Sequence, residues 1–293
     1  MPKTVTVFTP TYNRAYIIEK LYRSLVAQTC QDFCWMVVDD GSQDNTREVI
    51  ASLSAENKIE ITYIYQENGG KQRAHNAGVA ACTTELFFCV DSDDTLVPSA
   101  IEDVLALWSR RCGDPKIAGI IAMRGESPDK PMKTWFPKGL ETTTMWDLYY
   151  KWHHKGDTAL IYRTDVLRKY PYDVAPGEKF IGETYVYHKI DQDYMLAVLP
   201  EIIWICKYLP DGYTKHVRKI TRDNPVSYMR LKRDYIDYSD TFIIKAQSTT
   251  LFLVGAYFAG CFWKAYRSLP NRVLATAAVP VAWLLVKTVF RKA

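Results

Sequence analysis

The stretch Leu86–Asp94, with the sequence LFFCVDSDD, places three carboxylates directly after an apolar run. Leu86–Val90 has the length and composition of a buried strand, and Asp91–Asp94 follow at its end. Carboxylates this close together repel one another unless a cation lies among them. Mg²⁺ and Mn²⁺ prefer oxygen ligands and are commonly held by one or two carboxylates together with substrate phosphates. The alternative is structural, because these carboxylates or Thr95 can cap a helix that begins near Pro98.

The sequence around this stretch alternates between strand-like and helix-like patterns. Helical spacing of apolar residues separates the apolar runs, for example at Ile17, Ile18, Leu21 and Leu25. Strands that alternate with helices predict an α/β fold with a mostly parallel sheet and helices on both faces. The five expected strands are Thr4–Thr9, Cys34–Val38, Ile59–Tyr65, Leu86–Val90 and Ile117–Met123.

Polar clusters follow three of these strands, at Thr9–Asn13, Asp39–Ser42 and Asp91–Asp94. In open α/β sheets, ligands bind in the crevice beyond the carboxyl ends of the strands. The sequence therefore predicts that three separate strands deliver polar groups to one ligand site.

The cluster Asp39-Asp40-Gly41-Ser42 suggests recognition of a base. A carboxylate accepts a hydrogen bond from uracil N3–H, whereas cytosine presents an acceptor at N3. An unpaired buried acceptor costs ~1–3 kcal/mol, which is enough to discriminate between the two bases. The structural alternative is a tight turn, because Asp-Gly favours turns by itself.

The segment Asn68-Gly69-Gly70-Lys71 places two glycines and a cation before an expected helix over Ala74–Ala81. Backbone amides at the start of a helix favour phosphate. The segment is not a P-loop, because the glycine spacing and the Lys-Ser/Thr ending of that motif are absent.

Four motifs together resemble those of the family 2 glycosyltransferases with the GT-A fold, of the type found in bacterial polysaccharide assembly. Their order and spacing match over roughly the first 125 residues. The motifs are Pro10-Thr11-Tyr12-Asn13-Arg14, Val37–Ser42, Asn68–Lys71 with Ala74 and Asn76-Ala77-Gly78, and Val90–Asp94.

The resemblance implies a nucleotide-sugar donor and a divalent metal, Mn²⁺ or Mg²⁺. Asp93 would hold the metal on the diphosphate, Asp94 would share or take over that role, and Asp91 would approach the ribose and the metal. Pro10, Thr11, Tyr12 and Asp39 would line the base pocket, and Lys71 would lie near the donor sugar. The full set of expected donor residues is Pro10, Thr11, Tyr12, Asn13, Asp39, Asp40, Lys71, Asp91 and Ser92.

The family resemblance also implies an inverting mechanism with a carboxylate base in the second half of the chain. Our candidate is Glu183, where a short loop opens an apparent helix, although Glu183 can merely favour that helix N-terminus. Glu178, Asp191 and Asp193 are competitors. The loop Tyr213–His216 is expected to close over the diphosphate.

The overall composition excludes some classes of protein. The net charge of +4 without a basic run argues against nucleic-acid binding. An odd number of scattered cysteines without a CxxC pair indicates reduced thiols rather than disulfides or a zinc site. The N-terminus enters a strand without a signal region, so we expect the catalytic part to face the cytosol.

The C-terminal part has no Asp or Glu after Asp240 and contains two apolar stretches, Leu251–Trp263 and Val273–Phe290. Apolar segments flanked only by cations favour a helical appendage lying on the inner surface of the cell membrane. The alternative is a buried helical hairpin. The expected regions are 1–125 for donor binding, 126–220 for the acceptor and the base, and 221–293 for this appendage.

The sequence thus predicts transfer of a sugar from a UDP-sugar to a hydroxyl of a saccharide, which we expect to be lipid-linked, in cell-surface polysaccharide synthesis. Two alternatives stay open. The first is a catalytically degenerate scaffold that binds sugar nucleotides at the membrane. The second is a nucleotidyltransferase, which Pro10–Asn13 disfavours because those enzymes generally carry a glycine-rich loop with Arg after the first strand.

Overall fold

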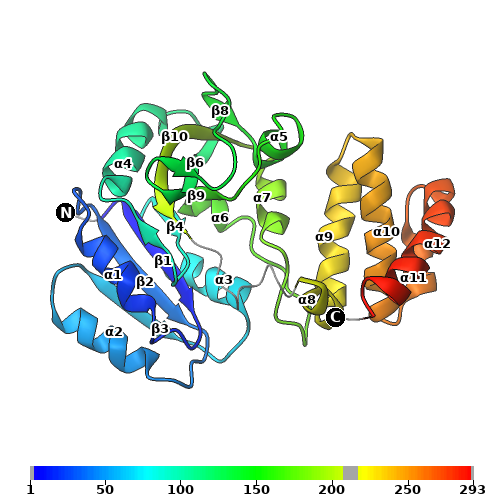
Figure 1. The fold of residues 1–293 in the computed structure, drawn as a ribbon, viewed down its shortest axis with the longest axis horizontal. Helices are drawn as coiled ribbons and strands as arrows, with labels where there is room; N and C mark the ends of the chain where they lie inside the picture. Colours follow the sequence, from blue (N-terminus) through cyan, green and yellow to red (C-terminus); the bar gives the residue numbers. More distant parts are fainter. Residues whose placement is uncertain (1–2, 207–216, 292–293) are drawn as a thin grey trace. The chain divides into compact units, whose positions relative to one another are not determined.

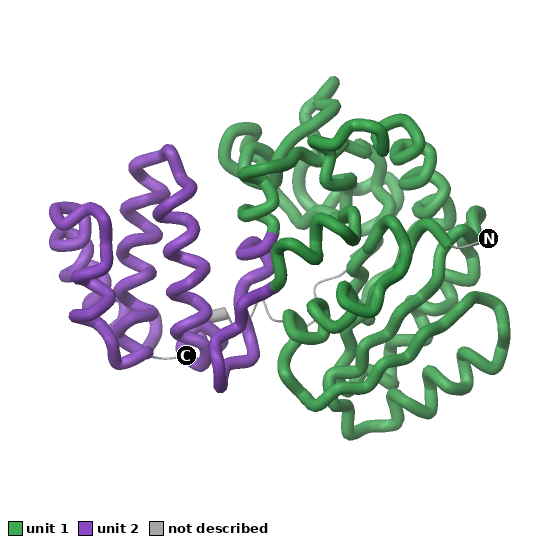
Figure 2. The backbone as a smooth tube through the Cα atoms, turned by 180° about the vertical axis from the view of Figure 1, so that it is seen from behind, with its two compact units in different colours: residues 1–171, 187–207 green, residues 172–186, 208–293 purple. Residues whose placement is uncertain are grey.

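A mixed ten-stranded sheet organises the first of two units in the computed structural model, which describes residues 3–206 and 217–291. The first unit comprises residues 1–171 and 187–207, and the second comprises residues 172–186 and 208–293 (Figure 2). The path through the sheet is β3-β2-β1-β4-β9-β6-β10-β5.

The first half of the sheet is parallel, as predicted. It consists of β1 (Val5–Thr11), β2 (Phe33–Asp39), β3 (Ile61–Tyr65) and β4 (Leu86–Cys89) (Figure 1). β1 is almost fully buried along its length, as expected for a parallel strand that is covered on both faces.

The second half of the sheet is mixed, and the expectation of a mostly parallel sheet is wrong here. β9 (Thr158–Arg163) lies antiparallel between β4 and β6 (Ile117–Ser127). The chain leaves β6 and re-enters β9 at the same end of the sheet, because Met123 pairs with Thr158, so no crossover helix is needed. β10 (Met195–Ile205) then runs parallel to β6, and short antiparallel strands complete the sheet: β5 (Thr95–Leu96), β7 (Lys130–Pro131) and β8 (Thr142–Thr143).

Helices cover both faces of the sheet. α1 (Ile18–Val26), α2 (Thr46–Ala55) and α4 (Ala100–Arg111) share one apolar core with alternate residues of the strands, such as Val5 and Val7 of β1. α3 (Lys71–Ala81) packs on the opposite face, where His75 makes edge contacts with Phe8 and Phe87. This side-to-side alternation follows from the two-residue repeat of a strand. The shorter helices α5 (Met145–Tyr150) and α6 (Thr164–Leu167) also belong to this unit.

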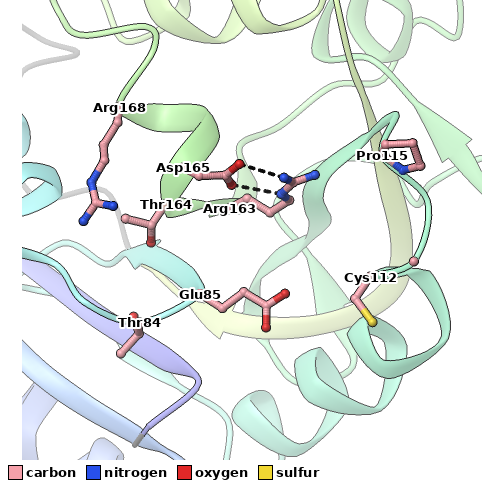
Figure 3. Close-up of a pocket in the computed structure, with 9 residues that line it drawn as sticks. Thr84, Glu85, Cys112, Pro115, Arg163, Thr164, Asp165 and Arg168 are labelled. Atoms are coloured by element: carbon pink, nitrogen blue, oxygen red, sulfur yellow. Dashed lines mark hydrogen bonds and ion pairs between the residues drawn. The ribbon is translucent and has the colours of Figure 1, made fainter.

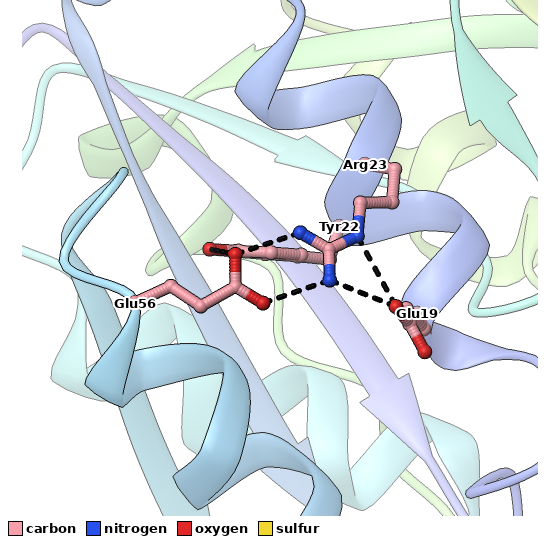
Figure 4. Close-up of polar contacts among 4 residues, drawn as sticks. All are labelled: Glu19, Tyr22, Arg23 and Glu56. Atoms are coloured by element: carbon pink, nitrogen blue, oxygen red, sulfur yellow. Dashed lines mark hydrogen bonds and ion pairs between the residues drawn. The ribbon is translucent and has the colours of Figure 1, made fainter.

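An ion-pair cluster on the surface ties α1 to the end of α2 (Figure 4). Arg23 donates to both carboxylate oxygens of Glu56, each at 2.7 Å, and also to Glu19 one turn earlier. Tyr22 donates a further hydrogen bond to Glu56. The charged side chains of the cluster are exposed to solvent, although Tyr22 is buried, so we assign the cluster a role in orienting the two helices rather than a large stabilising one.

The second unit is helical. It contains α8 (Val217–Asp223), α9 (Pro225–Tyr238), α10 (Phe242–Phe258), α11 (Phe262–Ser268) and α12 (Arg272–Thr288), while α7 (Thr184–Ile190) begins in its segment 172–186. Small residues on one side of α12 pack into a core that includes Leu253 and Val254 of α10. Within the described residues, we find no helix with the length and apolar character needed to cross a membrane.

Candidate donor-binding site

The ends of β1 and β2 bring the first two predicted clusters together. Thr11 and Asp39 are register partners, and the Asp40 amide donates to the Thr11 carbonyl at 2.8 Å. Asn13 has a left-handed backbone conformation (φ 53°). Its backbone N–H donates to Ser42 Oγ, and its side-chain oxygen accepts from the Gln43 backbone N–H. Asn13 therefore joins the two loops instead of merely following the strand.

Asp39 is held from two sides by hydrogen bonds. Its Oδ1 accepts from the Ser42 amide at 2.8 Å, and its Oδ2 accepts from the Tyr63 hydroxyl at 2.7 Å. The side chain is 1% exposed. An ionised carboxylate offers about four acceptor positions, so two donors leave capacity for a ligand.

The Asp40 carboxylate accepts hydrogen bonds from the neighbouring glycine loop. It accepts from the Gly69 amide at 2.9 Å, from the Gly70 amide at 2.7 Å, and from the side chains of Gln66 and Asn68. Four donors thus bind the Asp40 carboxylate, and these hydrogen bonds stabilise the loop before α3. A direct contact between Asp40 and the donor stays a prediction.

Lys71, the first residue of α3, reaches the acidic cluster. Its Nζ lies 2.6 Å from Asp91 Oδ1, and Arg124 Nη1 of β6 lies 3.8 Å from Asp91 Oδ2. Burial opposes ionisation of Asp91, but the two cations outweigh it and lower the pKa of that carboxyl. Asp91 is therefore a charged group that is already paired within the protein.

Asp94 is held by a residue from a distant strand. Trp204 Nε1 of β10 donates to Asp94 Oδ2 at 2.8 Å, and the Arg124 guanidinium lies 3.3 Å from the centre of the Trp204 ring. Burial, assisted by the neighbouring charge of Asp91, raises the pKa of Asp94 to about 7. Sequence reasoning missed Arg124 and Trp204, because neither lies in a recognisable motif.

Asp93 differs from its two neighbours. It is half-buried and, within residues 3–206 and 217–291, no hydrogen bond or ion pair to its carboxylate is recorded. In the same ranges we find no cluster of three His, Cys, Asp or Glu side chains that could cage a metal ion. The residues present therefore fit a cation that takes one or two carboxylates from the chain, Asp93 first, and its other ligands from phosphate and water.

Two buried polar side chains lack hydrogen-bond partners, and a bound ligand could provide them. Thr11 Oγ1 and both amide atoms of Gln72 have no hydrogen-bond partner among the described residues, although the two residues are only 3% and 1% exposed. Such orphaned groups are rare and need an explanation. Thr11 was predicted as a donor residue, whereas Gln72, in the first turn of α3, was not.

The remaining expected donor residues differ in exposure. Pro10 is half-buried near the end of β1, Tyr12 just beyond it is 45% exposed, and Ser92 is buried between Asp91 and Asp93. All expected donor residues thus lie at the carboxyl ends of β1 and β2, on the loops that follow β1, β2 and β4, or at the start of α3.

A family model described as glycosyl transferase family 2 matches residues 6–171, which is more than half of the chain. The chain belongs to this family. Among curated relatives, an uncharacterized glycosyltransferase of Nostoc sp. is 36% identical over 104 residues, or 36% of this chain and 32% of that protein. A validoxylamine A glucosyltransferase of Streptomyces hygroscopicus is 35% identical over 106 residues, or 35% of this chain and 25% of that protein. The matched part thus spans about a third or less of these relatives.

Solved glycosyltransferase structures share the fold. S. aureus TarS 1–349 in complex with UDP-GlcNAc has a TM-score of 0.59 at 17% identity, covering 90% of this chain and 89% of that one. The mannosyltransferase PcManGT of Pyrobaculum calidifontis, in complex with GDP-Man and Mn²⁺, has a TM-score of 0.57 at 19% identity, covering 100% and 83%. At these identities the likeness supports the GT-A type of fold alone.

The candidate base of this family 2 glycosyltransferase, Glu183, is half-buried directly before α7, in the second unit. Its backbone carbonyl accepts hydrogen bonds from the Tyr172 hydroxyl and the Val186 amide. The expected loop Tyr213–His216 lies outside the described residues.

The three competing carboxylates have structural partners. Glu178 accepts from the amides of Val226 and Ser227 and so caps α9. Asp191 accepts from the amides of Met145 and Trp146 and caps α5, while Asp193 accepts from the Tyr170 hydroxyl. Capping by these side chains satisfies amides that a helix start leaves unpaired.

A cavity of about 460 Å³ lies at the opposite end of the strands, next to the amino-terminal end of β4 (Figure 3). Thr84 and Glu85 precede β4, and Arg163 ends the antiparallel β9, so these lining residues lie opposite the acidic cluster. Arg163 and Asp165 form an ion pair at 2.7 Å. The cavity contains none of the expected donor residues and is separate from the candidate site.

Proposed function

We propose that this family 2 glycosyltransferase is an inverting, metal-dependent enzyme that transfers sugar from a UDP-sugar to a saccharide hydroxyl. The observation that carries the proposal is the gathering of Asp39, Asp91 and Asp93 at one edge of the sheet. Of these, Asp93 is the carboxylate without a recorded partner in the described part of the chain. A cation bound to a diphosphate would give the Asp93 carboxylate the partner that it lacks here.

The chain's residues have separate roles in this proposal. Asp39 accepts the N3–H of uracil, Asp91 contacts the ribose, and Lys71 lies beside the diphosphate and the sugar. Asp93, with Asp94, holds Mn²⁺ or Mg²⁺, which supplies charge neutralisation for the leaving diphosphate. Glu183 removes the proton from the attacking hydroxyl, which displaces the diphosphate from the opposite face of the anomeric carbon. Holding both substrates in line supplies much of the rate gain.

Calorimetry of UDP, CDP and GDP with the wild-type protein, each with Mn²⁺ and with EDTA, tests the donor assignment. We expect UDP to bind about 5-fold to 150-fold more tightly than CDP, because an unpaired buried acceptor costs ~1–3 kcal/mol. EDTA should weaken binding of UDP. A screen of UDP-sugars for release of UDP then tests turnover.

Three other outcomes are informative. A preference for GDP or CDP would keep the enzyme class and overturn the role of Asp39. Binding of UDP without turnover of any UDP-sugar would favour the degenerate scaffold. If no nucleotide bound in the presence of metal, the proposal would fail.

We also propose that the helical second unit binds the anionic inner surface of the cell membrane, where a lipid-linked saccharide would serve as acceptor. One side of α12 packs inward through residues such as Ala278 and Ala282, while Val273 is 82% exposed and Leu284 is 60% exposed on the other side. Trp263 of α11 is 63% exposed. Cations alone accompany these apolar groups after Asp240, which favours an anionic partner.

Vesicle sedimentation tests the membrane proposal. We expect binding to vesicles that contain phosphatidylglycerol, little binding to pure phosphatidylcholine, and weakening in high salt because screening shortens electrostatic reach. Lys264→Glu on α11 should lower binding several-fold. Lys219→Glu makes the same charge change on α8, whose described side chains include no large exposed apolar group, and serves as the control. If the protein instead formed dimers, did not bind vesicles, and became monomeric in Leu284→Glu, a second copy of the chain would be the partner of this face.

A further inference from the structure

We propose that Tyr63 is a positioning residue that selects the base of the donor by fixing the orientation of the Asp39 carboxylate. The inference rests on the proposed function, because it assumes that Asp39 receives the base. It concerns β3, the edge strand of the sheet, which the family motifs do not include.

The hydrogen-bond chemistry fixes the direction of the Tyr63 proton. The Tyr63 hydroxyl lies 2.7 Å from Asp39 Oδ2, and the Arg47 guanidinium carbon lies 5.9 Å from the centre of the Tyr63 ring. An ionised carboxylate can only accept a hydrogen bond. The Tyr63 hydroxyl therefore donates its proton to Asp39. Burial and this hydrogen bond to Asp39 raise the pKa of Tyr63 to about 12, so the hydroxyl keeps its proton at neutral pH.

Two donors then hold the Asp39 carboxylate against rotation. The Ser42 amide fixes Oδ1 from the loop after β2, and Tyr63 fixes Oδ2 from the adjacent strand. The free acceptor positions of Asp39 therefore point in defined directions. Without the Tyr63 hydroxyl the Asp39 carboxylate can rotate about its Cβ–Cγ bond. Its preference for the N3–H of uracil over the N3 acceptor of cytosine then declines.

The surroundings of Tyr63 allow a clean test. Tyr65 lies two residues further along β3, on the same face of the strand, and the Arg47 guanidinium lies 4.9 Å from its ring centre. Tyr65 is half exposed, and within the described part of the chain its side chain makes no hydrogen bond to Asp39. Arg47 is exposed on α2, and a cavity of about 460 Å³ lies beside these side chains. Removal of a hydroxyl from either tyrosine should therefore leave the packing of β3 intact.

The test compares Tyr63→Phe with Tyr65→Phe and wild type in calorimetric titrations with UDP and CDP at saturating Mn²⁺. We expect Tyr63→Phe to lower UDP affinity about tenfold and to reduce the ratio of UDP to CDP affinity by a similar factor. In turnover, KM for the UDP-sugar should rise while kcat changes little, because contacts to the base are the same in the ground state and the transition state. Tyr65→Phe should match wild type in each measurement.

The outcomes separate this inference from the proposed function. If wild type prefers UDP and Tyr63→Phe keeps the same preference, the positioning role is wrong while the proposed function stands. Equal losses of UDP and CDP affinity would indicate a general structural effect and would also overturn it. Wild type that binds no UDP overturns both. If Tyr63→Phe fails to fold, Tyr63→Met provides the second variant, because it also removes the hydroxyl that donates to Asp39: it should lower the same ratio, and an unchanged ratio would contradict the proposal.

Discussion

Asp93→Asn should lower kcat/KM for the UDP-sugar by about 100-fold to 1,000-fold, as expected for loss of a metal contact worth several kcal/mol in the transition state. The physical reason lies in the partners of the neighbouring carboxylates. Lys71 neutralises Asp91 at 2.6 Å, and Trp204 occupies one oxygen of Asp94 at 2.8 Å. Asp93 has no such recorded partner among residues 3–206 and 217–291, so we expect it to be the principal protein ligand of the cation.

Steady-state kinetics across a range of Mn²⁺ concentrations, with UDP calorimetry in Mn²⁺ and in EDTA, measures this effect. Asp94→Asn is the comparison variant: its amide oxygen can still accept from Trp204, and because Asp94 only shares the metal with Asp93, its loss should be smaller, less than about tenfold. A large loss in Asp94→Asn with a small one in Asp93→Asn would move the metal role by one residue. Activity of Asp93→Asn within a few-fold of wild type would contradict a metal site at this position.

The first half of the sheet could be predicted from the sequence because parallel strands buried on both faces leave a distinct pattern. β2 is a continuous apolar run up to Asp39, β1 alternates apolar residues with threonines, and each strand leads into the polar cluster that the structure places at one end of the sheet. The sequence predicted that these clusters meet, whereas the register that pairs Thr11 with Asp39 is known from the structure. Local sequence was sufficient here because each contact joins the ends of neighbouring strands.

The second half could not be predicted, because its contacts depend on long-range pairing. β9 is inserted antiparallel between β4 and β6, and no local signal distinguishes its apolar residues from those of a parallel strand. The contact between Trp204 and Asp94 joins residues 110 positions apart, so it exists only once β10 has paired. The Tyr63–Asp39 hydrogen bond and the unpaired amide of Gln72 were not predicted for a related reason, since both depend on neighbours that only the folded chain brings close.

The structure also sharpens the choice among candidate bases, although the base itself stays a prediction. The sequence put Glu183 first and left three other carboxylates as competitors. Three of them accept hydrogen bonds that support local structure, as Glu178 does for the first turn of α9. A general base needs a carboxylate oxygen that can reach a substrate hydroxyl, which makes a capping carboxylate a poor candidate.

Glu183→Gln should therefore leave binding of the UDP-sugar and Mn²⁺ within about twofold of wild type while lowering kcat by about 100-fold to 10,000-fold, the usual contribution of a general base. Gln keeps the shape of the side chain but cannot take up the proton of the attacking hydroxyl. Initial rates with an accepted saccharide and calorimetry with the donor separate the two effects. The residual rate should also lose any rise with pH that reflects ionisation of Glu183.

Glu178→Gln gives the contrasting control, because both of its oxygens cap α9. Loss of a charged cap should lower the free energy of unfolding by ~0.5–2 kcal/mol, and kcat per folded molecule should change little. If Glu178→Gln abolished turnover in a folded protein while Glu183→Gln did not, the two assignments would be exchanged. The comparison is decisive because a capping role and a base role predict opposite combinations of stability and rate.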